Sequence, residues 1–198
     1  LGPSLANYSK DLVSEYLYVG SYLSLAVLTF IPTILFLFYE SKTIIKENIN
    51  YTGRSYLELI SQPRFIQALA ASAFGYAIMT FLMTATPISM HVMEKMSLSK
   101  TGIVIQFHVA SMFLPSLVTG HLIKKIGHSN VIYIGIFFYS ITLFISIFDQ
   151  TFLNYMFALI FLGLGWNFLF ISGTSLLVLT YEENEKFKAQ GLNDFVVY

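Results

Sequence analysis

Five long stretches of this chain contain no Asp, Glu, Lys or Arg. Each stretch has at least 18 residues, and an α-helix needs roughly 20 residues to cross about 30 Å of hydrocarbon. The charged residues all lie between or beyond these stretches. The pattern therefore predicts five complete transmembrane helices, at residues 16–39, 65–87, 101–122, 131–148 and 152–179.

The composition agrees with a membrane environment. Of the 198 residues, 56% are hydrophobic and 11% are charged, whereas about 25% of the residues in a soluble domain are charged. We therefore predict an all-α, multipass transmembrane bundle surrounded by the lipid bilayer.

The chain contains no cysteine, which excludes a thiolate metal site, and we expect neither a metal nor a cofactor. Its net charge of zero argues against nucleic acid as a partner, because nucleic acid requires a clustered basic surface.

The basic residues are distributed unevenly between the two ends of the predicted helices. If the helices alternate in direction, one membrane face has three basic residues and the other has eight: Lys42, Lys46, Arg54, Arg64, Lys124, Lys125, Lys186 and Lys188. Because basic residues resist translocation, we assign the face with eight to the cytoplasm. The first helix then enters from outside and an odd number of helices precedes it. Together with the opening residue, Leu1 rather than Met, this leads us to expect a longer protein.

A short basic segment separates the third and fourth predicted helices. Residues 120–127 read Gly-His-Leu-Ile-Lys-Lys-Ile-Gly, which predicts a tight turn at the membrane face. The segment resembles the Gly-x-Leu-x-Asp-Arg-x-Gly loop that major facilitator superfamily transporters carry between the second and third helices of each half. Gly120 and Gly127 match this loop, whereas Lys124 replaces its acidic residue and Lys125 replaces its Arg.

The resemblance implies a conformational latch. In the family, the basic turn pairs with acidic residues at the end of a neighbouring helix and keeps one access state closed at the cytoplasmic face. On this ground we expect a latch formed by Gly120, Lys124, Lys125, Gly127, Glu182, Glu183 and Glu185. The alternative is ordinary solvated charge, since an exposed ion pair contributes at most about 1 kcal/mol.

The resemblance also implies a division of the chain. Residues 1–40 would hold the end of a loop and a helix similar to the sixth of the family, and residues 41–64 the cytoplasmic linker. Residues 65–198 would form a partial second half, with four complete helices and the start of a fifth. The missing N-terminal half would supply the rest of the cavity.

The chain is also similar to a bacterial branch of largely unassigned transporters. Riboflavin uptake is one role proposed for that branch, and we assign no substrate on that ground.

Polar side chains within the predicted helices are candidates for substrate binding, because in hydrocarbon they are costly and usually face protein or a water-filled cavity. In the third helix, His108 and Ser111 share a face. Two interpretations of His108 stay open: it handles substrate or a coupling proton, or it packs against a neighbouring helix with its nitrogens satisfied. Tyr76 in the second helix is equally compatible with packing and with cavity lining.

The fifth predicted helix has the most distinctive composition. Residues 163–174 read Gly-Leu-Gly-Trp-Asn-Phe-Leu-Phe-Ile-Ser-Gly-Thr. Hydrogen-bonding side chains beside glycines near mid-membrane are typical of a transporter binding site. The alternative is a close helix contact in which the amide bonds to a neighbouring helix. We predict a neutral or aromatic organic solute and six substrate-binding residues: Asn167, Trp166, His108, Tyr76, Ser111 and Thr174.

These observations favour a secondary active transporter that moves a small organic solute by alternating access. The alternative is a non-transporting, membrane-embedded assembly or sensor subunit. We do not expect an enzyme, because no carboxylate lies inside a complete helix to orient a histidine or bind a metal. The expected partners are a small-molecule substrate, the bilayer and the missing half, with a coupling proton or ion left open. The expected location is the plasma membrane, which for a bacterial protein is the inner membrane.

Overall fold

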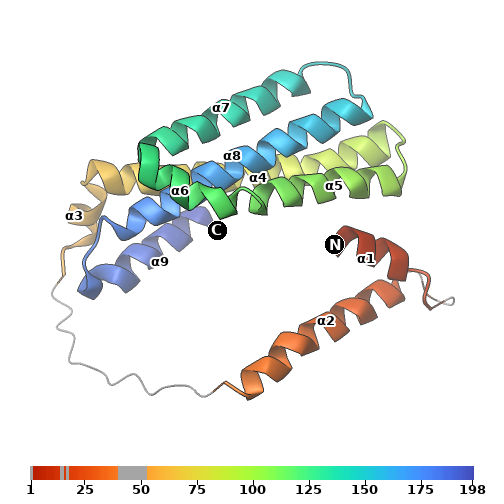
Figure 1. The fold of residues 1–198 in the computed structure, drawn as a ribbon, viewed down its shortest axis with the longest axis horizontal. Helices are drawn as coiled ribbons and strands as arrows, with labels where there is room; N and C mark the ends of the chain where they lie inside the picture. Colours follow the sequence, from red (N-terminus) through yellow and green to blue (C-terminus); the bar gives the residue numbers. More distant parts are fainter. Residues whose placement is uncertain (1, 14–15, 17, 40–52) are drawn as a thin grey trace. The chain divides into compact units, whose positions relative to one another are not determined.

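The computed structural model describes residues 2–13, 16, 18–39 and 53–198. The chain divides into two compact units, residues 1–49 and 50–198 (Figure 1). Residue 40 and residues 41–52 of the predicted linker, among them Lys42 and Lys46, lie outside the described residues.

The described residues include five helical segments that are long and apolar enough to cross a membrane. These segments are Val19–Leu37, Pro63–Met93, Leu98–Ile126, His128–Ser146 and Phe152–Val178. They coincide with the five predicted stretches, and no β-strand occurs in the described part of the chain. The prediction of an all-α multipass bundle is therefore confirmed.

The first unit consists of α1 (Gly2–Ser9) and α2 (Val19–Leu37). The hydroxyl of Ser21 donates a hydrogen bond to the carbonyl of Ala6 at 2.7 Å. Most side chains of α2 are exposed within this unit, which suits an apolar helix whose remaining neighbours are lipid or other membrane helices.

The second unit holds all the other helices. A capping box starts its first short helix: Ser55 Oγ accepts from the backbone N–H of Glu58, and the Glu58 carboxylate accepts from the backbone N–H of Ser55. The elements follow in the order α3 (Tyr56–Ile60), α4 (Pro63–Ile88), the π-helical turn η1 (Ser89–Met93), α5 (Leu98–Phe113), α6 (Ser116–Ile126), α7 (His128–Ser146), α8 (Phe152–Val178), the 3-10 turn η2 (Glu183–Glu185) and α9 (Lys186–Val197).

The third span and the turn after it differ from the prediction. The expected single helix at residues 101–122 is two helices, α5 and α6, interrupted at Leu114 and Pro115, because proline lacks the N–H that would continue the hydrogen-bond ladder. The expected turn at residues 120–127 is mostly helical, since α6 extends to Ile126. Gly127 alone makes the turn, with φ 83° and ψ 159°, a conformation open in practice only to glycine.

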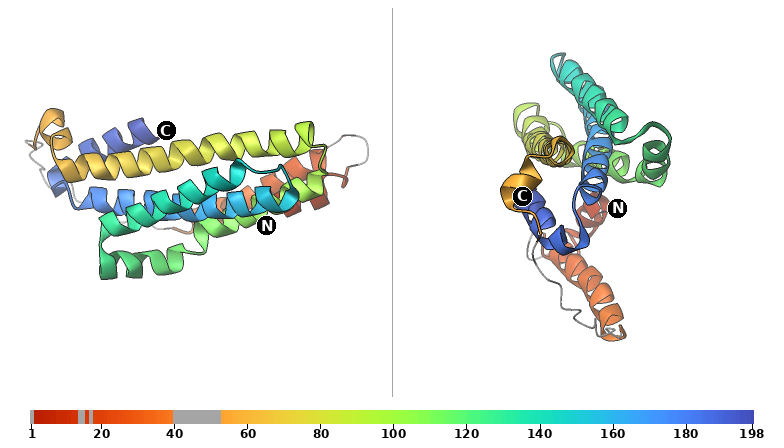
Figure 2. Two further views of the ribbon diagram at one scale, coloured as in Figure 1. Left: turned by 90° about the horizontal axis from the view of Figure 1, so that it is seen from above. Right: turned by 90° about the vertical axis from the view of Figure 1, so that its left-hand side faces the viewer.

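Helix α8 lies at the centre of the second unit and packs against α4, α5 and α7 (Figures 1 and 2). Glycines on three sides of α8 allow this. A Cβ added to Gly163 would overlap Ser111 of α5, and one added to Gly165 would overlap Tyr139 of α7. A Cβ added to Gly173 would lie 2.8 Å from the backbone nitrogen of Ser72 in α4. The small-residue helix contact proposed from the sequence is thus present on three faces.

The loops of the second unit collect at its two ends. The α3–α4 junction, the α6–α7 turn and the α8–α9 connection lie at one end (Figure 1). This end carries Arg54, Arg64, Lys124, Lys125, Lys186 and Lys188. The opposite end has the α4–α5 and α7–α8 connections, with Lys95 and Lys100. We call the first end the basic end, and its assignment to the cytoplasm from the excess of basic residues stays a prediction.

Replacing Gly163 by Val tests the packing of α8. The branched side chain would push against Ser111 and the backbone of α5, and overpacking of this kind costs about 1–3 kcal/mol or more. We expect a clear loss of monodisperse protein in size-exclusion chromatography of detergent extracts. Gly102→Ala is the matched control, because no atom lies within 4 Å of its added Cβ. Equal recovery of the two variants would contradict the packing role of Gly163.

Candidate functional site

Five aromatic side chains form a continuous series of ring contacts across the second unit. Trp166 and Phe170 of α8 are stacked, with centroids 4.8 Å apart and planes inclined by 11°. Phe113, the last residue of α5, packs edge-on against Trp166 at 6.0 Å. Tyr76 of α4 lies 6.3 Å from Phe170 and 4.9 Å from Tyr198, which follows α9. We call these five residues the aromatic row.

The aromatic row is buried at its centre and accessible at its ends. Trp166 is 8% exposed, whereas Phe113 is 59% and Tyr198 is 77% exposed. The indole N–H of Trp166 is buried and has no acceptor among the described residues. Buried N–H groups are nearly always paired, so this donor lacks its usual acceptor within the described residues. The row therefore has ring faces, the hydroxyl groups of Tyr76 and Tyr198 and an unpaired, buried indole N–H.

The structure brings together two of the six predicted substrate-binding residues in this row. Tyr76 and Trp166 lie on different helices, and Phe170 contacts both rings. Thr174 lies one turn beyond Phe170, and its hydroxyl donates to the Phe170 carbonyl at 2.8 Å. Thr174 thus uses its hydroxyl proton within α8.

Asn167 is engaged with neighbouring helices. Its side chain is fully buried, and its Nδ2 donates to the carbonyl of Met112 at 2.6 Å and to Ser116 Oγ at 2.7 Å. Its Oδ1 accepts from Thr119 Oγ1 at 2.6 Å. Both amide hydrogens are used, so the geometry supports the interhelical interpretation of Asn167 and gives no support to direct contact with substrate.

His108 and Ser111 face α8 from α5. His108 is fully buried, and its Nδ1 lies 2.8 Å from the carbonyl oxygen of Leu159, a geometry in which Nδ1 carries the proton. Its Nε2 has no partner in the described part of the chain. Ser111 Oγ donates to the carbonyl of His108 at 2.7 Å. The packed interpretation of His108 therefore accounts for one ring nitrogen and leaves the other as an unused acceptor.

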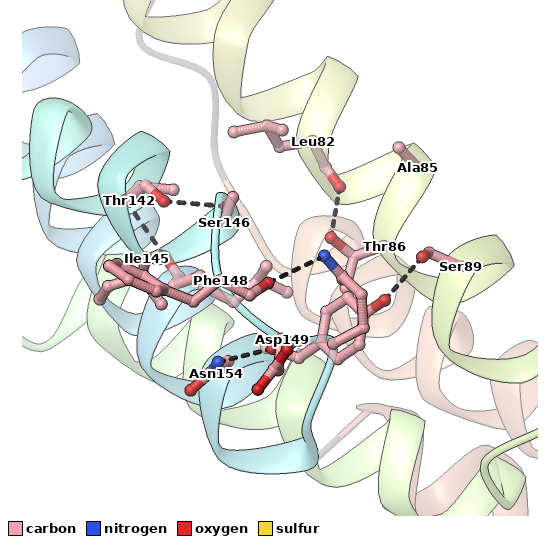
Figure 3. Close-up of a pocket in the computed structure, with 14 residues that line it drawn as sticks. Leu82, Ala85, Thr86, Ser89, Thr142, Ile145, Ser146, Phe148, Asp149 and Asn154 are labelled. Atoms are coloured by element: carbon pink, nitrogen blue, oxygen red, sulfur yellow. Dashed lines mark hydrogen bonds between the residues drawn. The ribbon is translucent and has the colours of Figure 1, made fainter. Parts of the chain in front are cut away.

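A small cavity of about 180 Å³, lined by both polar and apolar side chains, lies at the end of the second unit opposite the basic end (Figure 3). Its walls come from α4, η1, α7, α8 and the α7–α8 connection. Ser89 Oγ and the Tyr155 hydroxyl are hydrogen bonded across it at 2.6 Å. None of the six predicted substrate-binding residues lines this cavity, so it is separate from the aromatic row.

The predicted latch residues occupy the basic end. Lys124 and Lys125 are exposed in the last turn of α6, where positive charge is favoured by the helix dipole. Gly120 lies within α6 with open space around it. Glu182 and Glu183 are exposed. Neither lysine forms a salt bridge within the described ranges, so their pairing with these two acids stays a prediction.

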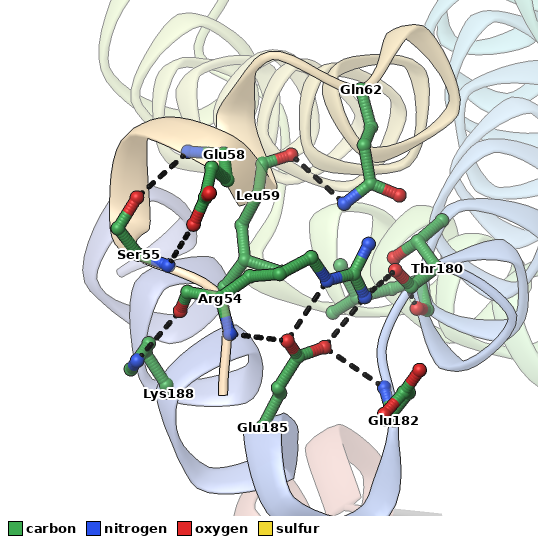
Figure 4. Close-up of polar contacts among 10 residues, drawn as sticks. Arg54, Ser55, Glu58, Leu59, Gln62, Thr180, Glu182, Glu185 and Lys188 are labelled. Carbon is green, nitrogen blue, oxygen red and sulfur yellow. Dashed lines mark hydrogen bonds and ion pairs between the residues drawn. The ribbon is translucent and has the colours of Figure 1, made fainter. Parts of the chain in front are cut away.

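Glu185 has a different partner from the one expected, namely Arg54 rather than a lysine of α6 (Figure 4). Arg54 Nη2 lies 2.5 Å from Oε2 of Glu185, and Arg54 Nε donates to Oε1 at 2.8 Å. The backbone N–H of Arg54 also donates to Oε1, at 2.7 Å. The Glu185 side chain is only 2% exposed. A forked arginine pair satisfies a buried carboxylate better than one flexible lysine can.

Neighbouring groups complete this ion pair. Arg54 Nη2 donates to the carbonyl of Thr180 at 3.1 Å, and Lys188 Nζ donates to the carbonyl of Arg54 at 2.7 Å. The backbone N–H of Glu182 donates to Oε2 of Glu185 at 3.0 Å. These bonds join the segment that precedes α3 to the connection between α8 and α9. We call this group the Arg54–Glu185 network.

The network shifts the pKa of both charged partners. Hydrogen bonding from Arg54, above all, lowers the pKa of Glu185 to about 2 from its ordinary 4.5. The hydrogen bond to Glu185 raises the pKa of Arg54. The backbone N–H of Ser55 lowers the pKa of Glu58 in the capping box. All three groups therefore stay charged at neutral pH.

Reasoning from the sequence missed Arg54 and Phe113 as partners of predicted residues. Arg54 was counted only as part of the basic face, and nothing in the sequence links it to an acid 131 positions away. For Phe113, no feature of the sequence indicates its contact with Trp166. The Ser55-x-x-Glu58 spacing of a capping box was a readable sign that an ordered helix starts beside Arg54.

Glu185→Gln tests the network and its pH dependence. Because the folded-state pKa is depressed, the pair stabilises the protein fully above about pH 4.5 and loses this stabilisation as the pH falls towards 2. We expect the variant to be less stable by about 1–3 kcal/mol at pH 7, and the difference from wild type to shrink below pH 4.5. Thermal unfolding of the full-length protein across pH measures this. Glu183→Gln, at an exposed position, is the control, and a pH-independent difference would contradict the assignment.

Comparison with known proteins places the chain in a family. Residues 1–198 match the Major Facilitator Superfamily. The chain is 38% identical over 200 residues to the riboflavin transporter RfnT of Brucella anthropi. This match covers 100% of this chain and 50% of that protein. It is 35% and 37% identical to YdeG and YddS of Bacillus subtilis, two uncharacterized MFS-type transporters, over 61% of this chain and 28% of each of theirs.

The chain thus spans half or less of the length of these relatives. No solved structure matches it significantly. The match over the whole length agrees with the resemblance seen in residues 120–127 and with the five apolar helices. The chain belongs to the Major Facilitator Superfamily.

Proposed function

We propose that this chain is part of a secondary transporter that moves a planar aromatic solute of the riboflavin type across the membrane by alternating access. The aromatic row is the observation that carries this proposal. Its support from outside the structure is the relative named as a riboflavin transporter, which is similar to the chain over its whole length.

The aromatic row suits a planar ring system. Riboflavin carries a flat, three-ring heterocycle with carbonyl oxygens and ring nitrogens at its edge. Stacking of a flat heterocycle on an aromatic side chain contributes about 1–3 kcal/mol per ring. The exposed ring of Phe113 and the stacked pair behind it offer such faces. The unpaired indole N–H of Trp166 offers a donor to an edge carbonyl.

We propose that the solute is neutral or aromatic rather than charged. The aromatic row contains no ionisable acid or base of the Asp, Glu, Lys, Arg or His set, and α8 carries none along its length. His108 of α5 is fully buried and its Nε2 is an unused acceptor within the described residues, and we propose it as the group in this half that responds to a coupling proton.

Alternating access requires contacts that form in one access state and break in the other. When the two states have nearly equal free energies, a weak contact is enough to shift their populations. We propose that Lys124 and Lys125 at the α6–α7 turn pair with Glu182 and Glu183 when the cytoplasmic face is closed. The exposure of all four side chains leaves them available to do so. The plasma membrane, the inner membrane of a bacterial cell, is the proposed location.

Trp166→Ala tests the proposed solute site. We expect roughly 5- to 150-fold weaker riboflavin binding and slower uptake, because one stacking face worth about 1–3 kcal/mol is lost. Uptake of labelled riboflavin into proteoliposomes that contain the full-length protein measures transport, and flavin fluorescence measures binding.

Two variants serve as controls for this test. Trp166→Phe keeps a stacking face and should retain most of the binding while losing the indole donor. Phe137→Ala changes an exposed ring of α7 outside the row and should have no effect. Uptake that is unaffected by Trp166→Ala would contradict the site. Binding without any flux would favour the alternative, a sensor subunit that does not transport.

Exchanging both lysines, Lys124 and Lys125, for Glu tests the proposed latch. Like charges would then face Glu182 and Glu183, and we expect the population of protein closed at the cytoplasmic face to fall by up to about fivefold, as the loss of about 1 kcal/mol allows. Accessibility of an engineered cysteine to a membrane-impermeant reagent, applied from each side, reports the two populations. Lys95→Glu at the opposite end is the control. Unchanged populations would refute the latch.

A further inference from the structure

The membrane-spanning segment formed by α5 and α6 is interrupted beside the aromatic row. Leu114 and Pro115 separate the two helices, and the carbonyl groups in the last turn of an α-helix have no intrahelical donor. The backbone N–H groups of Leu117 and Val118 already bond to Leu114 and Pro115, within the new helix. The last turn of α5 therefore needs donors from elsewhere, and the two parts of the segment need a restraint on their relative angle.

Asn167 of α8 bonds to both sides of the interruption. Its amide nitrogen donates to Met112 O, in the last turn of α5, at 2.6 Å and to the hydroxyl of Ser116, the first residue of α6, at 2.7 Å. Its amide oxygen lies 2.6 Å from the hydroxyl of Thr119, one turn into α6. This hydroxyl also lies 2.8 Å from the carbonyl of Pro115, so its one proton serves both acceptors, with the shorter distance to Asn167. One fully buried side chain thus holds three points across the break.

The element that carries Asn167 is the best-anchored helix of the second unit. Gly163 lies one turn before Asn167 and packs directly against the backbone of α5. Trp166, the residue before Asn167, contacts Phe113, which immediately precedes the break. A molecule stacked on Trp166 would therefore lie beside the residue at which α5 ends.

We propose that Asn167 is a positioning residue that fixes the angle between α5 and α6, and that it affects transport through this angle without touching the solute. Binding sites of transporters are typically formed by discontinuous membrane helices, and hinges in proteins are a few residues at the ends of elements that let one part move against another. Loss of the bonds from Asn167 should widen the range of angles at residues 114 and 115. The effect on transport rests on the proposed function, whereas the effect on the angle does not.

Spin-label distances across the break test this directly. The chain has no cysteine of its own, and Ser99 and Lys125 are exposed at the two ends of the segment, roughly 40 Å apart at 1.5 Å per residue. Labels at these positions, in the full-length protein in lipid nanodiscs, report the angle. We expect Asn167→Ala and Thr119→Val to broaden the distance distribution relative to the wild type.

Two variants make the distance test specific. Thr119→Val keeps the shape of the side chain and removes one bond to Asn167, so it remains informative if Asn167→Ala does not fold. Thr86→Val is the matched control, because the hydroxyl of Thr86 donates within its own helix, to the carbonyl of Leu82. Unchanged distributions in folded Asn167→Ala and Thr119→Val proteins, or equal broadening in Thr86→Val, would overturn the proposal.

Riboflavin uptake separates positioning from contact. A positioning residue should lower the maximal rate, by roughly fivefold or more, while KM stays within about twofold of the wild type. A rise in KM of tenfold or more with little change in maximal rate would instead make Asn167 a solute ligand and overturn the inference. If the wild-type protein takes up no riboflavin, the proposed function fails, and the distance distributions alone decide the role of Asn167.

Discussion

The close approach of α8 to three other helices is the contact on which the second unit depends. In a bilayer, lipid is as apolar as the side chains it replaces, so helices associate through tight packing and hydrogen bonds rather than through burial from water. Gly163, Gly165 and Gly173 remove the side chains that would hold α5, α7 and α4 away. Because α8 has no charged residue along its length, it can be surrounded in this way at no cost in buried charge.

This central helix presents different chemistry to its different neighbours. Trp166 and Phe170 stack on one another and join Phe113 and Tyr76 in the aromatic row. Asn167, the next residue after Trp166, turns instead to the backbone and hydroxyls of α5 and α6. Solute contact and helix positioning are therefore proposed for adjacent residues of one anchored element, which explains how a ring bound at the row would be sensed at the break in α5 and α6.

Charge at the basic end is organised in two ways that differ in strength. Arg54 and Glu185 form a forked pair in which the carboxylate is buried and accepts further backbone N–H groups, so it ties the segment before α3 to the α8–α9 connection. Lys124 and Lys125 are exposed in the last turn of α6. Solvent screens such charges, and their pairs are weak. The strong charge pair therefore ties fixed segments together, and the exposed charges are the ones for which we propose a latch that forms in one access state.

The sequence alone determined where the five spans lie, the basic end and the resemblance to the family, because the cost of charge in hydrocarbon is a property of each residue in turn and the motif at residues 120–127 is a local pattern. It did not show that the third span is interrupted at Leu114 and Pro115 or that α6 continues to Ile126. It also singled out Trp166 and Asn167, since polar and aromatic groups among glycines are unusual in a span. Only the tertiary structure decided what these residues contact. Asn167 meets partners about 50 positions away and Glu185 meets Arg54 across 131 positions, and such pairings depend on how whole helices pack, which no local pattern specifies.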